Sequence, residues 1–216
     1  MERLDEIIDQ IHKSFETRTK VRDRALKQAR YLTRHCANAI RAVHRGERDV
    51  AREKIEQAAQ LVDELDQMAS EHPDIYYAGY TQDALKEFAE ANITDALING
   101  EPIPLPSELN LEYEPYMKGL AETAGELRRR CLDILRHGHS QEAERLLTLM
   151  DDIYAILVTM DYPKAITGGL RRLTDIVRSI TERTRGDLTM SLRQERLERR
   201  LQALEDHTSE IIDNHA

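Results

Sequence analysis

The chain has 216 residues, of which 33% are charged and only 5% aromatic, with no Trp, nine Gly and six Pro. So few turn-forming and aromatic residues argue against a β-sandwich or β-barrel. The net charge of −9, from 40 acidic and 31 basic side chains, argues against a nucleic-acid binder when it is taken as a total.

Apolar residues recur with helical spacing along nearly the whole chain, which predicts a series of amphipathic helices. The first covers about Lys20 to Arg45, on a stripe that includes Leu26 and Thr33, and continues upstream to Leu4. Further helices are predicted over 49–69, 75–98, 116–137 and 140–160, and each is followed within a few residues by Pro or Gly. The last begins near residue 167 and passes residue 204.

This pattern contains no convincing strand and no linker long enough to separate two domains. We therefore expect an all-α fold, a single domain over 1–216 built from about six or seven long helices, with 206–216 as a frayed polar tail. No run of 18 apolar residues is present and the start lacks the features of a signal peptide, so a soluble cytoplasmic protein is expected, without a membrane partner. Cys36 and Cys131 have no CxxC partner and are predicted to be buried thiols.

Charge is divided unevenly along the chain. Residues 11–50 hold 11 basic and 4 acidic side chains, net +7, and residues 161–200 hold 10 and 6, net +4. Residues 51–120 between them hold 4 basic and 15 acidic side chains, net −11. The total charge therefore conceals two basic segments on either side of an acidic one.

The first basic segment places a row of cations beside the apolar stripe of its helix. Arginine binds phosphate through two parallel hydrogen bonds, so such a row suits a nucleic-acid backbone. A solvated helix face, or pairing with an acidic helix nearby, explains the same pattern and stays open. The candidate nucleic-acid-binding residues are Arg24, Lys27, Arg30, Arg34 and Arg41.

Two acidic pairs at helical spacing are the candidate metal ligands. Glu87 and Glu90 lie three residues apart in LKEFAEA, and Glu122 and Glu126 lie four apart in LAETAGELRRR. Four carboxylates from two helices can hold Mg²⁺, which prefers oxygen ligands, or Mn²⁺ in its place. Such pairs also arise by chance in an acidic chain, and Arg129 stands at ion-pair spacing from Glu126, as on an ordinary surface.

Taken in order, these segments resemble the translin superfamily, which comprises translin and its partner, translin-associated factor X (Trax). The chain is most similar to the archaeal members. The resemblance spans about Arg22 to Thr189, through the segments RDRALKQARYLTRHCANAIRAVHRGE, LKEFAEANITDALING, YMKGLAETAGELRRRCLDIL and YPKAITGGLRRLTDIVRSITERTRGDLT.

The resemblance implies an all-α bundle that assembles into a hollow, roughly octameric shell, with RNA or single-stranded DNA against its inner wall. Trax-like members add a metal-dependent endoribonuclease whose acidic cluster matches Glu87, Glu90 and Glu126, with Glu122 where the family more often has Asp. We therefore expect a homo-oligomeric, Mg²⁺-dependent endoribonuclease for single-stranded or short structured RNA, in which these four residues are catalytic. A non-catalytic RNA- or ssDNA-binding shell is the alternative, and a helical scaffold that binds only protein is a third.

Overall fold

The computed structural model describes residues 1–69, 71–138 and 140–213, and within them the regular secondary structure is helical throughout, as the sequence predicts. The chain divides into two compact units, Met1–Thr123 with Pro163–Gly168, and Ala124–Tyr162 with Gly169–Ala216. The single-domain organisation stays a prediction. Among the described residues, no helix is both long and apolar enough to cross a membrane.

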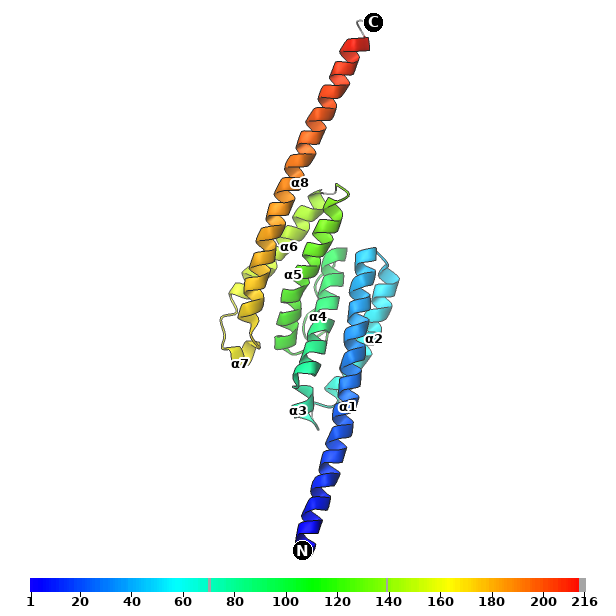
Figure 1. The fold of residues 1–216 in the computed structure, drawn as a ribbon, viewed down its shortest axis with the longest axis vertical. Coiled ribbons are helices and arrows are strands. Elements are labelled where there is room, and N and C mark those ends of the chain that lie inside the picture. Colours follow the sequence, from blue (N-terminus) through cyan, green and yellow to red (C-terminus); the bar gives the residue numbers. More distant parts are fainter. Residues whose placement is uncertain (70, 139, 214–216) are drawn as a thin grey trace. The chain divides into compact units, whose positions relative to one another are not determined.

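The first unit contains most of the helices. They are α1 (Glu2–Arg45), α2 (Arg48–Asp66), the single turn α3 (Pro73–Tyr76), α4 (Gly79–Asn99), the first part of α5 (Tyr113–Leu135) and the single turn α7 (Lys164–Thr167). α1 packs along both α2 and α4, and the three run side by side (Figure 1). α4 is enclosed by its neighbours, because residues all around it are buried, from Thr81 to Ala96.

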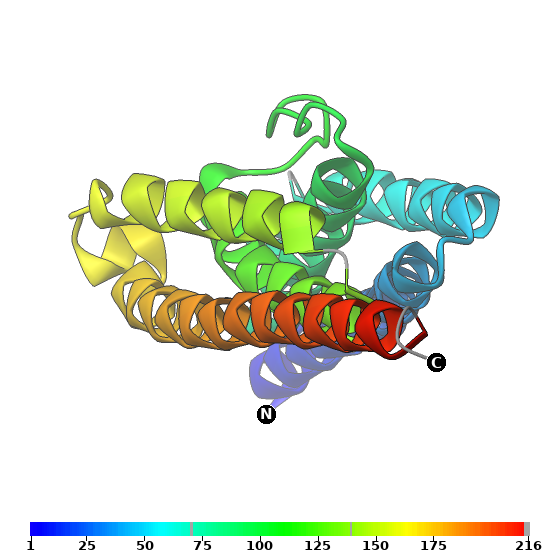
Figure 2. The same cartoon turned by 90° about the horizontal axis from the view of Figure 1, so that it is seen from above.

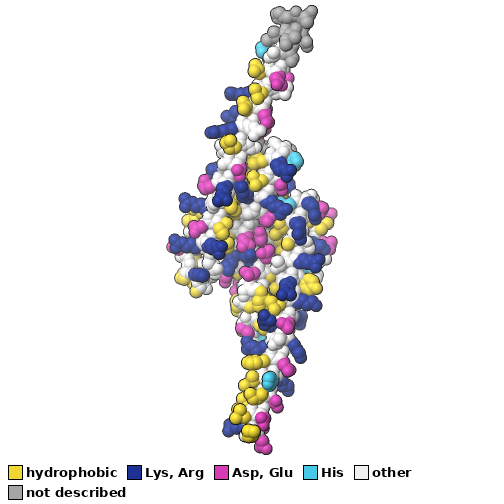
Figure 3. Space-filling model, viewed as in Figure 1, with side chains coloured by type: hydrophobic (Ala, Val, Ile, Leu, Met, Phe, Trp, Pro, Cys, Tyr) yellow, Lys and Arg dark blue, Asp and Glu magenta, His cyan; other side chains and the backbone are white. Residues whose placement is uncertain are grey.

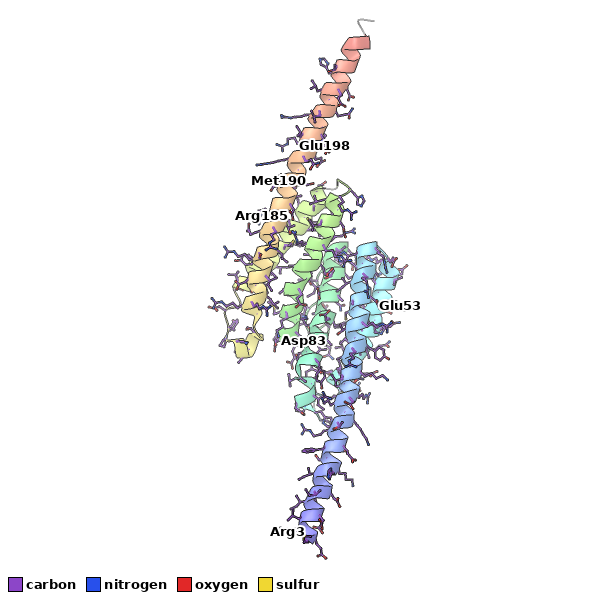
Figure 4. The ribbon with its side chains drawn as sticks, in the orientation of Figure 1. Arg3, Glu53, Asp83, Arg185, Met190 and Glu198 are labelled. Carbon is purple, nitrogen blue, oxygen red and sulfur yellow. The ribbon has the colours of Figure 1, made fainter. Side chains whose placement is uncertain are left out.

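α1 changes character along its length. From residue 25 onward it buries a stripe of mostly small side chains against α2 and α4, namely Ala25, Ala29, Leu32, Cys36, Ala39, Ile40 and Val43. The predicted stripe was wrong at Leu26, which is only partly buried, and at Thr33, which is exposed. The side chains of the first turns, such as the labelled Arg3, project outward from the helix (Figure 4).

Local backbone geometry sets the helix ends. Gly46 and Gly100 follow α1 and α4 with φ of 73° and 71°, a left-handed conformation that favours glycine and caps the last carbonyl groups. The helix predicted over 75–98 is divided, because Ala78 adopts an extended conformation (φ −65°, ψ 143°) between α3 and α4. The other boundaries differ from the predicted ones by a few residues.

The second unit consists of the remainder of α5, α6 (Ser140–Val158) and α8 (Leu170–Asp213). α6 and α8 pack along one another, as Figure 2 shows from above. Arg128 of α5 donates a hydrogen bond to Thr184 Oγ1 at 2.8 Å and pairs with Asp187 at 2.9 Å, which ties α5 to α8. α8 continues to Asp213, so residues 206–213, expected as a frayed tail, are helical here.

Candidate functional site

The candidate site begins with a close approach of two helices in the first unit. Gly119 of α5 is buried so tightly against α4 that a Cβ atom there would lie 2.5 Å from Ala89 Cβ and 2.7 Å from the Lys86 carbonyl oxygen. A residue without a side chain lets the two backbones approach this closely. Glu122, three residues further along α5, is consequently held beside the acidic residues of α4.

Three of the four predicted metal ligands meet at this contact. Carboxylate oxygens of Glu87, Glu90 and Glu122 all lie within 4.8 Å of one another. Glu90 is 8% exposed, while Glu87 and Glu122 are partly buried. Two such charges at this separation repel by roughly 3 kcal/mol at an effective dielectric constant of about 20, so the cluster attracts a compensating cation.

A lysine already contributes positive charge to the cluster. Lys86 Nζ lies 2.6 Å from Glu122 Oε2 and 3.2 Å from Glu87 Oε1, and its side chain is 15% exposed. Burial lowers the pKa of Lys86, but its hydrogen bonds and its attraction to Glu122 and Glu87 outweigh burial and raise the pKa above its ordinary value. Lys86 is therefore a cation at neutral pH.

Glu126, the fourth predicted ligand, belongs to the second unit. Its carboxylate lies 3.5 Å from Arg129, the ion pair that helical spacing allowed. Its membership of the metal cluster stays a prediction.

Behind the cluster, α1 contributes the fully buried thiol of Cys36. Burial, and then the charges of Glu87 and Glu90, raise the pKa of this thiol well above its usual range. Cys131, in the second unit, is also buried, and burial raises its pKa to about 11. Both cysteines are buried, as predicted, and both are protonated at neutral pH.

The five predicted nucleic-acid-binding cations are all exposed on α1. Figure 3 shows Lys and Arg side chains along this helix. Arg24 lies 3.8 Å from Glu64 of α2, and Arg41 donates a hydrogen bond to Asn38 at 2.6 Å. Most of the row is thus accessible to an external anion; its role in binding nucleic acid stays a prediction.

Sequence reasoning missed two residues of this site, Lys86 and Gly119. The sequence could have pointed to Lys86 because it directly precedes Glu87. It could have pointed to Gly119 because Gly119 and Ala89 are small residues, which allow two helices to approach closely. Neither signal is specific, because only the packing of α4 on α5 shows which residues meet.

Among sequences, a relative exists in Methanocaldococcus jannaschii, a protein described only as uncharacterized. It is 32% identical over 187 residues, which cover 86% of this chain and 82% of the relative. No protein-family model matches the chain.

Among solved structures, AfC3PO is similar both in its crystal structure and in its complex with duplex RNA. Each match has a TM-score of 0.77 and 29% identity and covers 85% of this chain, with 96% and 95% of AfC3PO covered respectively. The apo-NeC3PO structure matches with a TM-score of 0.78 over 85% of this chain and 96% of NeC3PO, at 18% identity, and so shares the fold.

Proposed function

This chain belongs to the translin superfamily, and from that premise we propose that it binds RNA and cleaves it as a Mg²⁺-dependent endoribonuclease. The observation that carries the proposal is the cluster of Glu87, Glu90 and Glu122, whose carboxylate oxygens lie within 4.8 Å of one another. The RNA complex of AfC3PO, 29% identical to this chain, supports the choice of substrate.

The cluster fits the proposed metal by its chemistry. Three carboxylates supply the oxygen donors that Mg²⁺ and Mn²⁺ accept, and their partial burial limits the water that competes for them. Glu87, Glu90 and Glu122 would hold the ion, and Glu126 would act as the fourth acid and orient or deprotonate the attacking water. A divalent ion held there supplies charge that polarises a phosphodiester and favours ionisation of water.

The exposed cations of α1 would hold the RNA backbone. Lys27, Arg30 and Arg34 make no ion pair with the described residues, so their charge is available for phosphates. Guanidinium groups suit this task because they bind phosphate oxygens in pairs. Short structured RNA, single-stranded RNA and ssDNA all present such a backbone, and the duplex in the AfC3PO complex favours structured RNA.

We further propose that the chain works as a homo-oligomer, in the octameric shell that the family resemblance implies. Apolar side chains recur at helical spacing and are exposed on α1, at Leu4, Ile8, Ile11 and Phe15, and on α8, at Leu197, Leu201 and Leu204. Contiguous exposed apolar side chains mark contact surfaces, and other copies of the chain would cover these. In a shell only the charge of the inner wall meets RNA, so a net charge of −9 is compatible with binding.

A non-catalytic RNA- or ssDNA-binding shell is the second candidate. Two observations favour it: Lys86 pairs with Glu122, and Glu122 is one methylene longer than the Asp that the family more often carries. Mg²⁺ demands strict ligand geometry, so both features bear on whether the ion is held productively.

One experiment separates the two candidates. Binding and cleavage of labelled RNA are measured with and without Mg²⁺ for the wild type, the Glu122→Gln/Glu126→Gln double variant and a Glu114→Gln control from the same helix. If the enzyme proposal is correct, the double variant cleaves about a hundredfold more slowly at unchanged RNA affinity, because a metal contributes several kcal/mol to such a step. Equal cleavage by the double variant and the wild type would disprove the site, and binding without Mg²⁺-dependent products in any protein would establish the alternative.

A second arm tests the cation row. Arg34→Ala should weaken RNA binding, and the slope of log affinity against log salt should become shallower by about one if the Arg34 side chain neutralises one phosphate. Unchanged affinity and salt dependence would remove α1 from the RNA interface.

A further inference from the structure

Lys86 holds a position at the carboxylate cluster that a surface lysine would not hold. Its aliphatic stem is covered, its side chain is 15% exposed, and its ammonium joins Glu87 on its own helix to Glu122 on α5. At 2.6 Å from Glu122 Oε2, the ammonium makes a short, charge-assisted hydrogen bond. It therefore neutralises part of the repulsion among three neighbouring carboxylates.

A divalent ion would need the same oxygens. Ligand oxygens around Mg²⁺ or Mn²⁺ must turn toward the ion at close range, and an ammonium bound to the same carboxylates is both a steric and an electrostatic competitor. Lys86 shares its single positive charge between two carboxylates, Glu87 and Glu122, so this part of the cluster remains attractive to a doubly charged ion. Binding of the ion and pairing of Lys86 with Glu122 are thus opposed.

We propose that Lys86 is the resident cation of the carboxylate cluster, which a divalent ion displaces from Glu122 when it binds. Lys86 thereby holds Glu87 and Glu122 together in the metal-free protein and lowers the affinity for the metal. The proposal rests on the proposed function, because it takes the cluster to be the metal site. It adds a residue that controls metal loading to those that would bind the metal.

The chain contains a matched control in Lys118. Lys118 Nζ lies 2.7 Å from Glu114 Oε1, and the two side chains are 20% and 33% exposed, against 15% and 30% for Lys86 and Glu122. The two ion pairs thus agree in distance and burial. They differ in surroundings, because Glu114 lies outside the carboxylate cluster.

The first test measures Mn²⁺ binding by calorimetry for the wild type, Lys86→Met and Lys118→Met. Methionine keeps most of the length of the lysine side chain and removes its charge. Lys86→Met should bind Mn²⁺ at least about fivefold more tightly than the wild type, as expected of two linked binding events that oppose each other, while Lys118→Met should match the wild type. Equal or weaker binding by Lys86→Met, with Mn²⁺ still bound by the wild type, would overturn the role of Lys86 and leave the metal site intact. Absence of Mn²⁺ binding in all three proteins would overturn both proposals.

The second test uses the wild type and so does not depend on how a variant folds. An amine-acylating reagent is applied with and without saturating Mn²⁺, and modification of each lysine is followed by mass spectrometry. Displacement from Glu122 should speed modification of Lys86 several-fold and leave Lys118 unchanged. An unchanged Lys86 rate at saturating Mn²⁺ would show that the ammonium keeps its place, which contradicts displacement.

Discussion

Gly119→Ala tests the helix contact on which the candidate site depends. The added methyl group would lie 2.5 Å from Ala89 Cβ, 2.7 Å from the Lys86 carbonyl oxygen and 2.8 Å from the Glu90 backbone nitrogen. Two of these atoms belong to the backbone of α4, so no side-chain rotation relieves the overlap and the helices must move apart. Overpacking of this kind costs about 1–3 kcal/mol.

A second effect opposes this cost. Alanine is favoured over glycine within a helix by about 1 kcal/mol, so a bare stability change would mix two terms of similar size. Gly125 on the same helix separates them, because a Cβ atom there would meet no atom within 4 Å. Gly125→Ala should therefore gain about 1 kcal/mol of stability, and Gly119→Ala should be less stable than Gly125→Ala by about 1–3 kcal/mol.

The assay is urea unfolding followed by circular dichroism for both variants and the wild type, together with Mn²⁺ affinity. Displacement of α5 carries Glu122 away from Glu87 and Glu90, so Gly119→Ala should bind Mn²⁺ more weakly than the wild type while Gly125→Ala should not. If Gly119→Ala is as stable as Gly125→Ala, the close approach of α4 and α5 is absent in solution and the reasoning is refuted.

Two further predictions concern ionisable groups. Burial raises the pKa of the Cys36 thiol, and it raises that of Cys131 to about 11. Both thiols should therefore react with a disulfide reagent at pH 8 far more slowly in the folded protein than in urea. A thiol that reacts at the same rate in the folded and the unfolded protein would contradict its burial. Burial also raises the pKa of the Asp95 carboxyl above its ordinary value of 3.8, so the folded protein binds the carboxyl proton more tightly than the unfolded chain does. The protein therefore loses stability as the pH rises from the pKa of Asp95 in the unfolded chain through its higher pKa in the folded protein. Asp95→Asn should reduce that loss between pH 4 and pH 7 in urea unfolding; an identical pH profile would show that Asp95 is not desolvated.

The regular elements were largely predictable because their causes are local. Helical spacing of apolar residues, with Gly or Pro after each stripe, placed the long helices to within a few residues. The break between α3 and α4 was missed, although Gly79, directly after the extended Ala78, is a residue type that often marks a helix boundary. Leu26 and Thr33 were assigned to the buried stripe of α1, but the neighbouring Ala25 and Leu32 are buried in their place. The side of a helix that faces the core depends on where its neighbours cross it.

The candidate site was likewise predictable only in part. The spacing of Glu87 and Glu90 shows by itself that their side chains lie near one another on one helix, and the resemblance to the translin superfamily supplies the chemistry. The surroundings of the pair were not predictable, since the sequence left an ordinary surface position open, whereas α4 is enclosed and Glu90 is buried. Burial of a carboxylate is decided by helices far away in the chain.

The sequence alone therefore determined that the chain is helical, where its helices lie, and that cations and carboxylates are segregated along it. These properties depend on residues within one or two helical turns of each other. Only the tertiary structure decided that Gly119 brings α5 against α4, that Glu122 joins Glu87 and Glu90, and that Lys86 is paired at the cluster. Contacts between helices depend on the shape and volume of side chains distant in sequence, which no local pattern records.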